Sequence, residues 1–252
     1  MDWNQLISCA LDIGEQMHVA GAEIYRVEEC ICRICKAYGA IDVDVFTITS
    51  AIILTMQSPD GTRWTQTCRI SRSGTDLHKV DALNRLSREM CQTTPDYETV
   101  QKKLTAIVED KTYPAWLEYV CYAGIAGAFT VFVGGGWQDT LLSMAIGAGL
   151  QGIVRLTAFL GFNRVFSSVL ASFYMSFLAI FLSSVIPACS ADYIIIGNIM
   201  PLIPGVGFTN SLRDMISGDT MSGILRFMEA CIIALAIAAG YWLASGILGV
   251  GV

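Results

Sequence analysis

The second half of this 252-residue chain has very few charged side chains. Residues 116–252 contain only ten of the 38 Asp, Glu, Lys and Arg residues. Long uncharged runs cover 119–137, 140–154, 165–191, 193–212 and 230–252. Several of these runs reach the roughly 20 apolar residues that a helix needs to cross a hydrocarbon core of about 30 Å. A soluble protein has no means of covering so much apolar surface, so the composition predicts an integral membrane protein.

Other classes of protein are excluded by what is missing. The net charge is −6 and the pI about 4.9, so the clustered Lys and Arg that neutralise phosphates are lacking, and no nucleic-acid partner is expected. Only two histidines occur, and there is no zincin helix, phosphate loop or nucleophile elbow. The first residues have neither a basic region nor a long apolar core, so we expect no signal peptide.

Lys and Arg are also absent from the segments around 134–139 and 188–192. With five spans and the N-terminus inside, all four arginines of the second half lie toward the inner side, as the positive-inside rule requires. These are Arg155, Arg164, Arg213 and Arg226. We therefore predict a cytoplasmic domain (1–115), five transmembrane helices (116–252) in the inner, or plasma, membrane, and a C-terminus outside. Trp116 and Trp137 bracket the first span as interface anchors.

Residues 1–115 predict an α+β domain in which helices flank a small antiparallel sheet. The apolar spacing indicates helices at 3–20 and 22–38, with Gly21 interrupting the path and Gly39 ending the second helix. Strand formers occupy 41–57 and return at 62–70, after a turn at Ser58-Pro59-Asp60-Gly61.

Two more helices complete the predicted domain. The first begins at Thr75, and its apolar face consists of Leu77, Val80, Leu83 and Leu86. Thr94-Pro95-Asp96 opens the second, with a cap, a first-turn proline and an acid near the helix dipole.

Two groups in this domain suggest chemistry. Cys30, Cys32 and Cys35 form C-x-C-x-x-C, but only the last two share a helical face and no nearby His completes a zinc site, so we favour small buried thiols over a metal. The charged segment 21–29, together with His18 and His78, leaves a hydrolase open as an alternative. We favour a solvated face with the ion pairs Glu23–Arg26 and Glu29–Arg33, and we expect no cofactor.

Two prolines and two glycines interrupt the run at 193–212. Pro201 and Pro204 remove backbone donors and free the carbonyls of Gly197 and Met200. Such carbonyls are tolerated at membrane depth only where they are buried or line a wet cavity, and broken helices mark substrate sites in transporters. A kink satisfied by neighbouring helices is the alternative.

A polar cluster follows this break, and charges within lipid are costly and usually functional. Arg226 and Glu229 are spaced to pair on one helix, as are Gln151 and Arg155. For Arg155, snorkelling to the inner interface is an equally weighted alternative. The candidate substrate-binding residues are Asn198, Pro201, Pro204, Gly205, Thr209, Asn210, Arg213, Asp214, Arg226, Glu229, Gln151 and Arg155.

Over essentially its whole length the chain resembles the threonine/serine exporter family. Its first half contains Gly21-Ala22-Glu23-x-Tyr25-Arg26-Val27-Glu28, Arg72-x-Gly74-x-Asp76-Leu77, Tyr113-Pro114-x-Trp116 and Phe132-x-Gly134-Gly135-x-Trp137-x-Asp139. The strongest stretch is Pro201-x-x-Pro204-Gly205, Asn210-x-x-Arg213-Asp214, Gly218-Asp219, Arg226 and Glu229-Ala230.

The resemblance implies a proton-coupled inner-membrane exporter of small polar metabolites and not an enzyme. The chain is similar to the larger subunit of the split type, so a separate small membrane subunit should supply the second half, and a symmetric homo-oligomer is the alternative. Arg213-Asp214 and Arg226-x-x-Glu229 look like the amino-acid branch, which favours threonine or serine over a succinate-like dicarboxylate. A membrane-tethered enzyme or a regulatory subunit is the rival reading.

A zwitterionic substrate needs a cation for its carboxylate and an acceptor for its ammonium group. Arg213 or Arg226 would meet the first need, and Asp214, Glu229 or the freed carbonyls would meet the second. Glu229 and Asp214 are the candidate proton-coupling residues, because desolvation raises the pKa of a carboxyl group.

Overall fold

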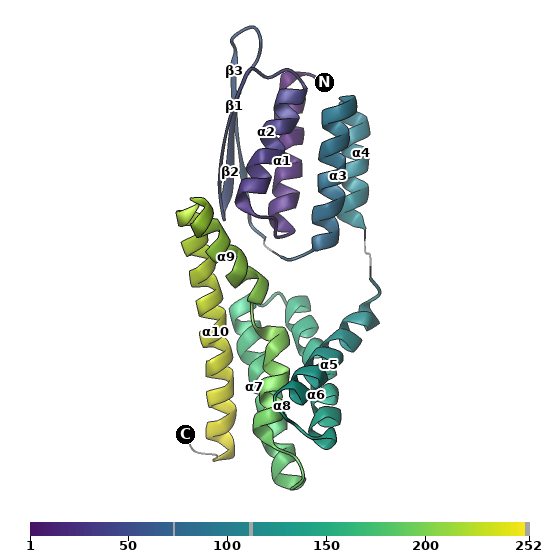
Figure 1. Ribbon diagram of the computed structural model, residues 1–252, viewed down its shortest axis with the longest axis vertical. Helices are drawn as coiled ribbons and strands as arrows, with labels where there is room; N and C mark the ends of the chain where they lie inside the picture. The colour runs from purple at the N-terminus through teal and green to yellow at the C-terminus, as the bar shows by residue number, and fades with distance from the viewer. Residues whose placement is uncertain (73, 111–112, 250–252) are drawn as a thin grey trace. The chain divides into compact units, whose positions relative to one another are not determined.

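The computed structural model describes residues 1–72, 74–110 and 113–249 (Figure 1). Most of these residues are helical, and three strands form a small sheet. The chain divides into two compact units, which we describe separately: residues 1–112 with 206–227, and residues 113–205 with 228–252. The predicted boundary after residue 115 falls near the first division. Residues 206–227, however, which the sequence assigned to the membrane domain, group with the N-terminal residues.

The first two helices of the first unit confirm the prediction. α1 spans Trp3–Val19 and α2 spans Ile24–Ala37. Gly21 lies between them at φ 91°, and Gly39 follows α2 at φ 99°. Glycine adopts positive φ without the steric cost that other residues carry, which explains why both helices end at these points.

The strand region predicted at 41–57 is a hairpin of two strands. β1 (Asp42–Ile48), β2 (Ala51–Gln57) and β3 (Arg63–Arg69) pair antiparallel in the order β1-β2-β3. The predicted turn around Pro59 connects β2 to β3. The turn between β1 and β2 consists of Thr49 and Ser50, with neither Gly nor Pro to indicate it.

α3 (Leu77–Thr93) and α4 (Tyr97–Glu109) begin later than predicted. Asp76 is the N-cap of α3 and accepts a hydrogen bond from the backbone N–H of Lys79. Leu77 is exposed, so of the four predicted residues Val80, Leu83 and Leu86 lie on the buried face, together with Ser87 and Met90. Thr94, at φ 40°, is the C-cap of α3, and Asp96 is the N-cap of α4, so Thr94 ends one helix and does not open the next.

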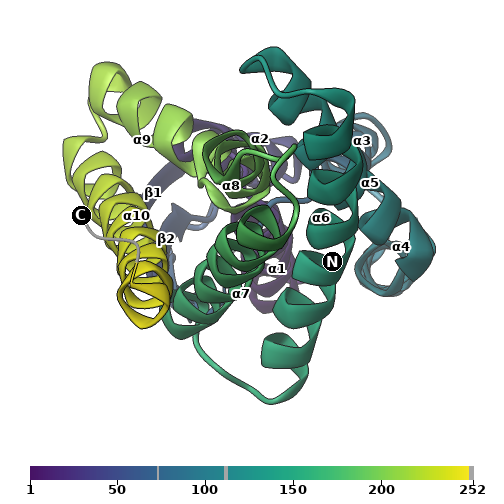
Figure 2. The same cartoon turned by 90° about the horizontal axis from the view of Figure 1, so that it is seen from below.

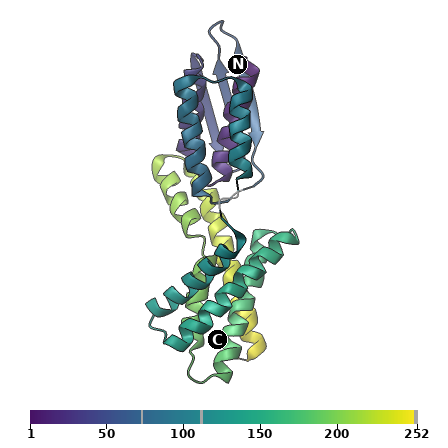
Figure 3. The ribbon, with the colours of Figure 1, turned by 90° about the vertical axis from the view of Figure 1, so that its right-hand side faces the viewer.

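The first unit is layered. α1 and α2 pack against the sheet on one side and against α3 and α4 on the other (Figure 1; Figure 3). These four helices therefore cover one face of the sheet and do not flank it. Phe46 and Ile53 are exposed on the other face. Large aliphatic side chains fill the space between the layers, among them Leu6, Leu11, Ile13, Ile31, Ile34, Ile52, Leu54 and Leu83.

Within the residues that the structure describes, four helices are long and apolar enough to cross a membrane. They are α5 (Ala115–Phe132), α6 (Trp137–Phe159), α7 (Arg164–Val185) and α10 (Thr220–Leu248). Trp116 lies in the first turn of α5 and Trp137 begins α6, so the two bracket the first span as predicted. The described residues thus provide four candidate spans, or five if an interrupted pair of helices counts as one.

The interrupted pair consists of α8 (Ala191–Ile199) with the 3-10 turn η1 (Met200–Leu202), and α9 (Gly205–Ser217). Pro201 lies within η1, Pro204 lies in the break, and Gly205 is the first residue of α9. The predicted helix break is therefore confirmed at the residues that predicted it.

Within the second unit, α8 packs against α5, α6 and α7 (Figure 2). Its close approach to α5 requires Gly197, because a Cβ there would overlap Thr130 Oγ1 and lie 2.6 Å from the carbonyl oxygen of Ala126. Small residues at helix contacts are typical of membrane bundles, in which backbones approach closely.

Candidate functional site

The predicted site residues fall into two groups, one in each unit. Thr209, Asn210, Arg213, Asp214 and Arg226 belong to the first unit. The second unit contains Gln151, Arg155, Asn198, Pro201, Pro204, Gly205 and Glu229.

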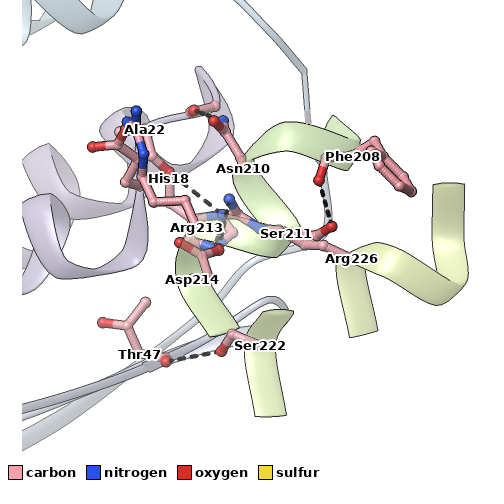
Figure 4. A network of polar contacts seen from close by, with 12 residues as sticks. His18, Ala22, Thr47, Phe208, Asn210, Ser211, Arg213, Asp214, Ser222 and Arg226 are labelled. Atoms are coloured by element: carbon pink, nitrogen blue, oxygen red, sulfur yellow. Dashed lines mark hydrogen bonds and ion pairs between the residues drawn. The ribbon is translucent and has the colours of Figure 1, made fainter. Parts of the chain in front are cut away.

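In the first unit, α9 and the start of α10 bring two arginines to carboxylates (Figure 4). Arg213 forms an ion pair with Glu23, the N-cap residue of α2. Arg226 Nη1 lies 3.2 Å from Asp214 Oδ2. The predicted pairing of Arg226 with Glu229 is therefore wrong, and both arginines proposed for a substrate carboxylate already have carboxylate partners.

The Arg226–Asp214 pair is the buried half of this network. Asp214 is 1% exposed and the Arg226 side chain 13%. Arg226 Nη2 lies 3.4 Å from both the carbonyl oxygen of Ala22 and His18 Nε2. The backbone N–H of Ile24, the first residue of α2, also interacts with the Asp214 carboxylate, and a negative charge at a helix N-terminus is favoured by the helix dipole.

His18 contributes a neutral imidazole to the buried half. Burial lowers the pKa of His18 to about 4, and the positive charge of Arg226 lowers it further in the same direction. A neutral imidazole accepts a hydrogen bond, whereas an imidazolium would repel the guanidinium. His18 therefore supports the position of Arg226.

The Glu23–Arg213 pair is the accessible half. Glu23 also lies 2.7 Å from Arg26, which confirms the predicted i,i+3 pair, as Glu29–Arg33 at 2.6 Å confirms the other. Glu23 is only 6% exposed, however, so it does not lie on the solvated face that the sequence suggested. The Arg213 side chain is 52% exposed, and Asn210 Nδ2, 3.5 Å from the carbonyl oxygen of Gly21, holds α9 against the α1–α2 turn.

The residues of the hydrolase alternative are engaged elsewhere. Glu23 and His18 each face arginines, and His78 lies 3.6 Å from Asp110. Cys30 and Cys35 are buried, and burial raises their pKa to about 11 and about 12. Among the residues that the structure describes, no three His, Cys, Asp or Glu side chains are grouped to bind a metal ion.

In the second unit, Asn198 of α8 joins two hydroxyl groups that the sequence analysis missed. Asn198 Nδ2 donates to the carbonyl oxygen of Ile194 and to Ser143 Oγ of α6, each at 2.9 Å. Ser143 Oγ lies 2.7 Å from Thr130 Oγ1 of α5, which is 2.8 Å from the carbonyl oxygen of Ala126. All three side chains are fully buried.

One atom of this cluster is unused. Because the carbonyl of Ile194 only accepts, the amide hydrogens of Asn198 must face it, and Oδ1 points the other way. Within the described residues, Asn198 Oδ1 has no hydrogen-bond partner although it is buried. An unpaired buried acceptor costs about 1–3 kcal/mol, so such an atom calls for an explanation.

The remaining candidates lie apart from Asn198. Gln151 is buried and donates to Glu118 Oε2 of α5, so the predicted pairing with Arg155 is wrong, and Arg155 is exposed. Glu229 faces outward on α10, and Thr209 is on the exposed side of α9. In the part of the chain that the structure describes, no hydrogen bond or ion pair joins Asn198 to Gln151, Arg155 or Glu229.

A groove between α6 and α7 is the wrong kind of site for a polar solute. Its volume is about 330 Å³, and its lining includes Leu156, Leu160, Phe173 and Phe177. Such a lining suits a lipid chain.

Membrane-spanning helices, a proline-broken helix and buried polar groups beside it define a membrane transporter. A family model described as "Putative threonine/serine exporter" matches residues 8–248, and the chain belongs to this family. The predicted family, the transport class and the membrane location are thereby confirmed.

Three relatives are informative. The chain is 25% identical over 236 residues to the "Probable succinate transporter subunit YjjP" of Klebsiella aerogenes, an alignment that covers 93% of this chain and 89% of the relative. It is 24% identical over 230 residues to the Escherichia coli K12 protein of the same name, covering 91% and 89%. It is 25% identical over 185 residues to the "Threonine/serine exporter" of Corynebacterium glutamicum, covering 68% and 36%. No solved structure matches the chain.

Proposed function

We propose that this chain is the larger subunit of a two-component inner-membrane exporter of threonine- or serine-like amino acids. One observation carries the proposal: Asn198, fully buried in α8 just before the helix break, has an acceptor without a donor. Polar groups and irregular backbone persist at membrane depth where they meet a polar solute.

An unused acceptor favours a substrate that brings a donor. Threonine and serine carry an ammonium group and a hydroxyl, whereas a succinate dianion carries only acceptors. Gly147 lets α6 approach α5 closely beside this oxygen, because a Cβ there would lie 2.8 Å from Ala126 Cβ, 2.9 Å from the carbonyl oxygen of Tyr122 and 3.2 Å from Asn198 Oδ1. Asn198 and the carbonyls freed by Pro201 and Pro204 would receive the ammonium group.

Within the first unit, Arg213 is the more accessible of the two arginines and would take a carboxylate. Arg226 is enclosed by Asp214, Ala22 and His18, so it serves to position α10 against α2. Asp214, which is buried, and Glu229 remain the candidates for proton coupling. If Glu229→Gln left the proton dependence of transport unchanged, Glu229 would lose that role.

The proposed topology places residues 1–115 in the cytoplasm, five spans in residues 116–252, and the C-terminus outside. Support comes from the grouping of Arg213 and Arg226 with the N-terminal residues, because the positive-inside rule assigns both arginines to the same side as the N-terminus. The relatives named as subunits support a separate membrane partner, because a five-span chain lacks an inverted second half.

Counterflow into proteoliposomes tests the proposal. The chain would be reconstituted with and without a small membrane subunit, and uptake of labelled threonine would be measured against internal threonine, serine or succinate. We expect exchange with the two amino acids. Asn198→Leu should reduce exchange to background while the protein stays monodisperse, and Ser184→Ala, which removes an exposed hydroxyl of α7, should leave exchange unchanged.

A succinate-like dicarboxylate is the second candidate. The two relatives whose names include succinate favour it. Faster exchange of succinate than of threonine in the same assay would select this candidate and would leave Asn198 Oδ1 without its explanation.

A further inference from the structure

We propose that Glu23 competes with the substrate carboxylate for Arg213, so that the start of α2 acts as an intramolecular gate on this arginine. This inference rests on the proposed function. It assigns a role to the N-terminal residues and names a residue that tunes the affinity for substrate.

Contacts on both sides of the carboxylate hold Glu23 in place. It is the N-cap residue of α2 and follows the turn at Gly21. The adjacent Ala22 accepts from Arg226, and Arg26 Nε lies 2.7 Å from Glu23 Oε2. The other oxygen, Oε1, pairs with Arg213. One carboxylate thus bridges a cation of its own helix and a cation of α9.

Burial decides which of the two arginines exchanges its partner. The Arg213 side chain is 52% exposed, against 13% for Arg226. The half-exposed Arg213 stays solvated when its partner leaves, whereas breaking the buried Arg226–Asp214 pair leaves an uncompensated charge at high cost. A carboxylate from solution can therefore replace Glu23 at Arg213, while Asp214 stays on Arg226.

The exchange leaves no charge unpaired. Arg213 passes from one carboxylate to another, and a guanidinium can bind the incoming group through two hydrogen bonds. Glu23, once released, keeps its ion pair with Arg26. Arg26 therefore sets how readily Glu23 releases Arg213, because the two arginines share one carboxylate.

Two substitutions should change the affinity in opposite directions. Glu23→Gln removes the competing charge and should lower the KM for the amino acid by roughly fivefold, which corresponds to an ion pair of about 1 kcal/mol. It removes no helix cap, because the Glu23 side chain makes no capping hydrogen bond. Arg26→Gln leaves Arg213 as the only cation on Glu23 and should raise the KM.

The matched control is Glu29→Gln. Glu29 lies on the same helix and loses the same charge, but it pairs with the exposed Arg33 and does not contact α9. Its KM should equal that of the unsubstituted protein. The assay is the counterflow of threonine by the full chain with its membrane subunit.

The outcomes separate the two proposals. A lower KM for Glu23→Gln with a higher KM for Arg26→Gln supports the gate. KM values equal to that of the unsubstituted protein in both variants, or a higher KM for Glu23→Gln, overturn the gate while leaving amino-acid export intact. If Glu23→Gln is poorly folded, Arg26→Gln carries the test. An unchanged KM for Arg26→Gln then overturns the gate and leaves the proposed function intact. Absence of any threonine, serine or succinate exchange by the unsubstituted protein overturns the proposed function, and the gate with it.

Discussion

The two units differ in the balance of side chains that they bury. Large aliphatic side chains, from Leu6 to Met90, fill most of the interior of the first unit. The second unit buries small and hydroxylated residues such as Ala171, Ser172 and Ser176, and it turns large aromatic ones outward, as at Phe132 and Phe159. Leu150, Met175 and Ile194 are also fully buried in the second unit, so the interior shifts toward small and hydroxylated residues without excluding large aliphatic ones.

This difference between the two interiors follows from the solvent around each unit. In water, removing apolar surface from solvent is the main driving force, so large aliphatic side chains go inside. In lipid, the surroundings are as apolar as the interior, so close backbone packing and interhelical hydrogen bonds hold helices together. Ser172 shows this directly, since its Oγ donates to the carbonyl oxygen of Ile237 across α7 and α10 at 2.6 Å.

The largest effect should come from deleting a buried aliphatic group of the first unit. Ile31→Ala empties a fully buried position of α2 and should lower the free energy of unfolding of that unit by ~3 kcal/mol. Hydrogen exchange of α2 peptides in the full-length protein, measured by mass spectrometry, reports this change. Leu150→Ala, at an equally buried position of α6, should destabilise its own helix less, because lipid already surrounds the second unit with apolar groups. Equal losses in the two units would contradict the comparison.

Adding a methyl group should damage the second unit instead. Gly197→Ala would place a Cβ against Thr130 Oγ1 and the backbone of α5, and overpacking of this kind costs about 2 kcal/mol. We expect a lower midpoint for thermal loss of monodisperse protein in detergent. Gly124→Ala is the matched control, since no atom lies within 4 Å of the added methyl group. Equal midpoints for the two variants would show that α8 does not depend on close contact with α5.

Local patterns predicted the local structure. The 3.6-residue period predicted α1 and α2, Pro201 and Pro204 predicted the helix break, and the spacing of Glu23 and Arg26 predicted their ion pair. Each of these features depends on residues a few positions apart. The turn at Thr49 and Ser50 escaped because hydrogen bonds of the flanking strands, and not the turn residues, determine it.

Contacts between distant segments were beyond sequence reasoning. Nothing in the residue pattern links Glu23, the N-cap residue of α2, to Arg213 of α9. Arg226 likewise pairs with Asp214 of α9 and not with a residue of its own helix. Thr130 and Ser143 were missed for another reason. Hydroxyls in apolar helices usually bond to their own backbone, as Thr130 does to Ala126, so their presence gives no sign of a shared cluster.

The smallest predicted effect concerns His18 and tests whether the buried network behaves like the aliphatic core around it. Burial lowers the pKa of His18 from 6.5 to about 4, so between these values the unfolded state binds a proton that the folded state does not. The free energy of unfolding should therefore fall as the pH falls through this window, by about 1 kcal/mol between about pH 7.5 and about pH 5.5.

Other groups beside the network also titrate, so the contribution of His18 is tested by comparing variants. Burial raises the pKa of Glu28, which contributes with the opposite sign, because its folded form takes up a proton more readily as the pH falls. Hydrogen exchange of α1 and α2, corrected for the intrinsic effect of pH, should show a weaker loss of stability in His18→Gln than in the unsubstituted protein. His78→Gln changes a partly exposed imidazole next to Asp110 and should keep the full loss. An identical pH dependence in all three proteins would mean that Arg226 and its buried partners do not depend on a neutral His18.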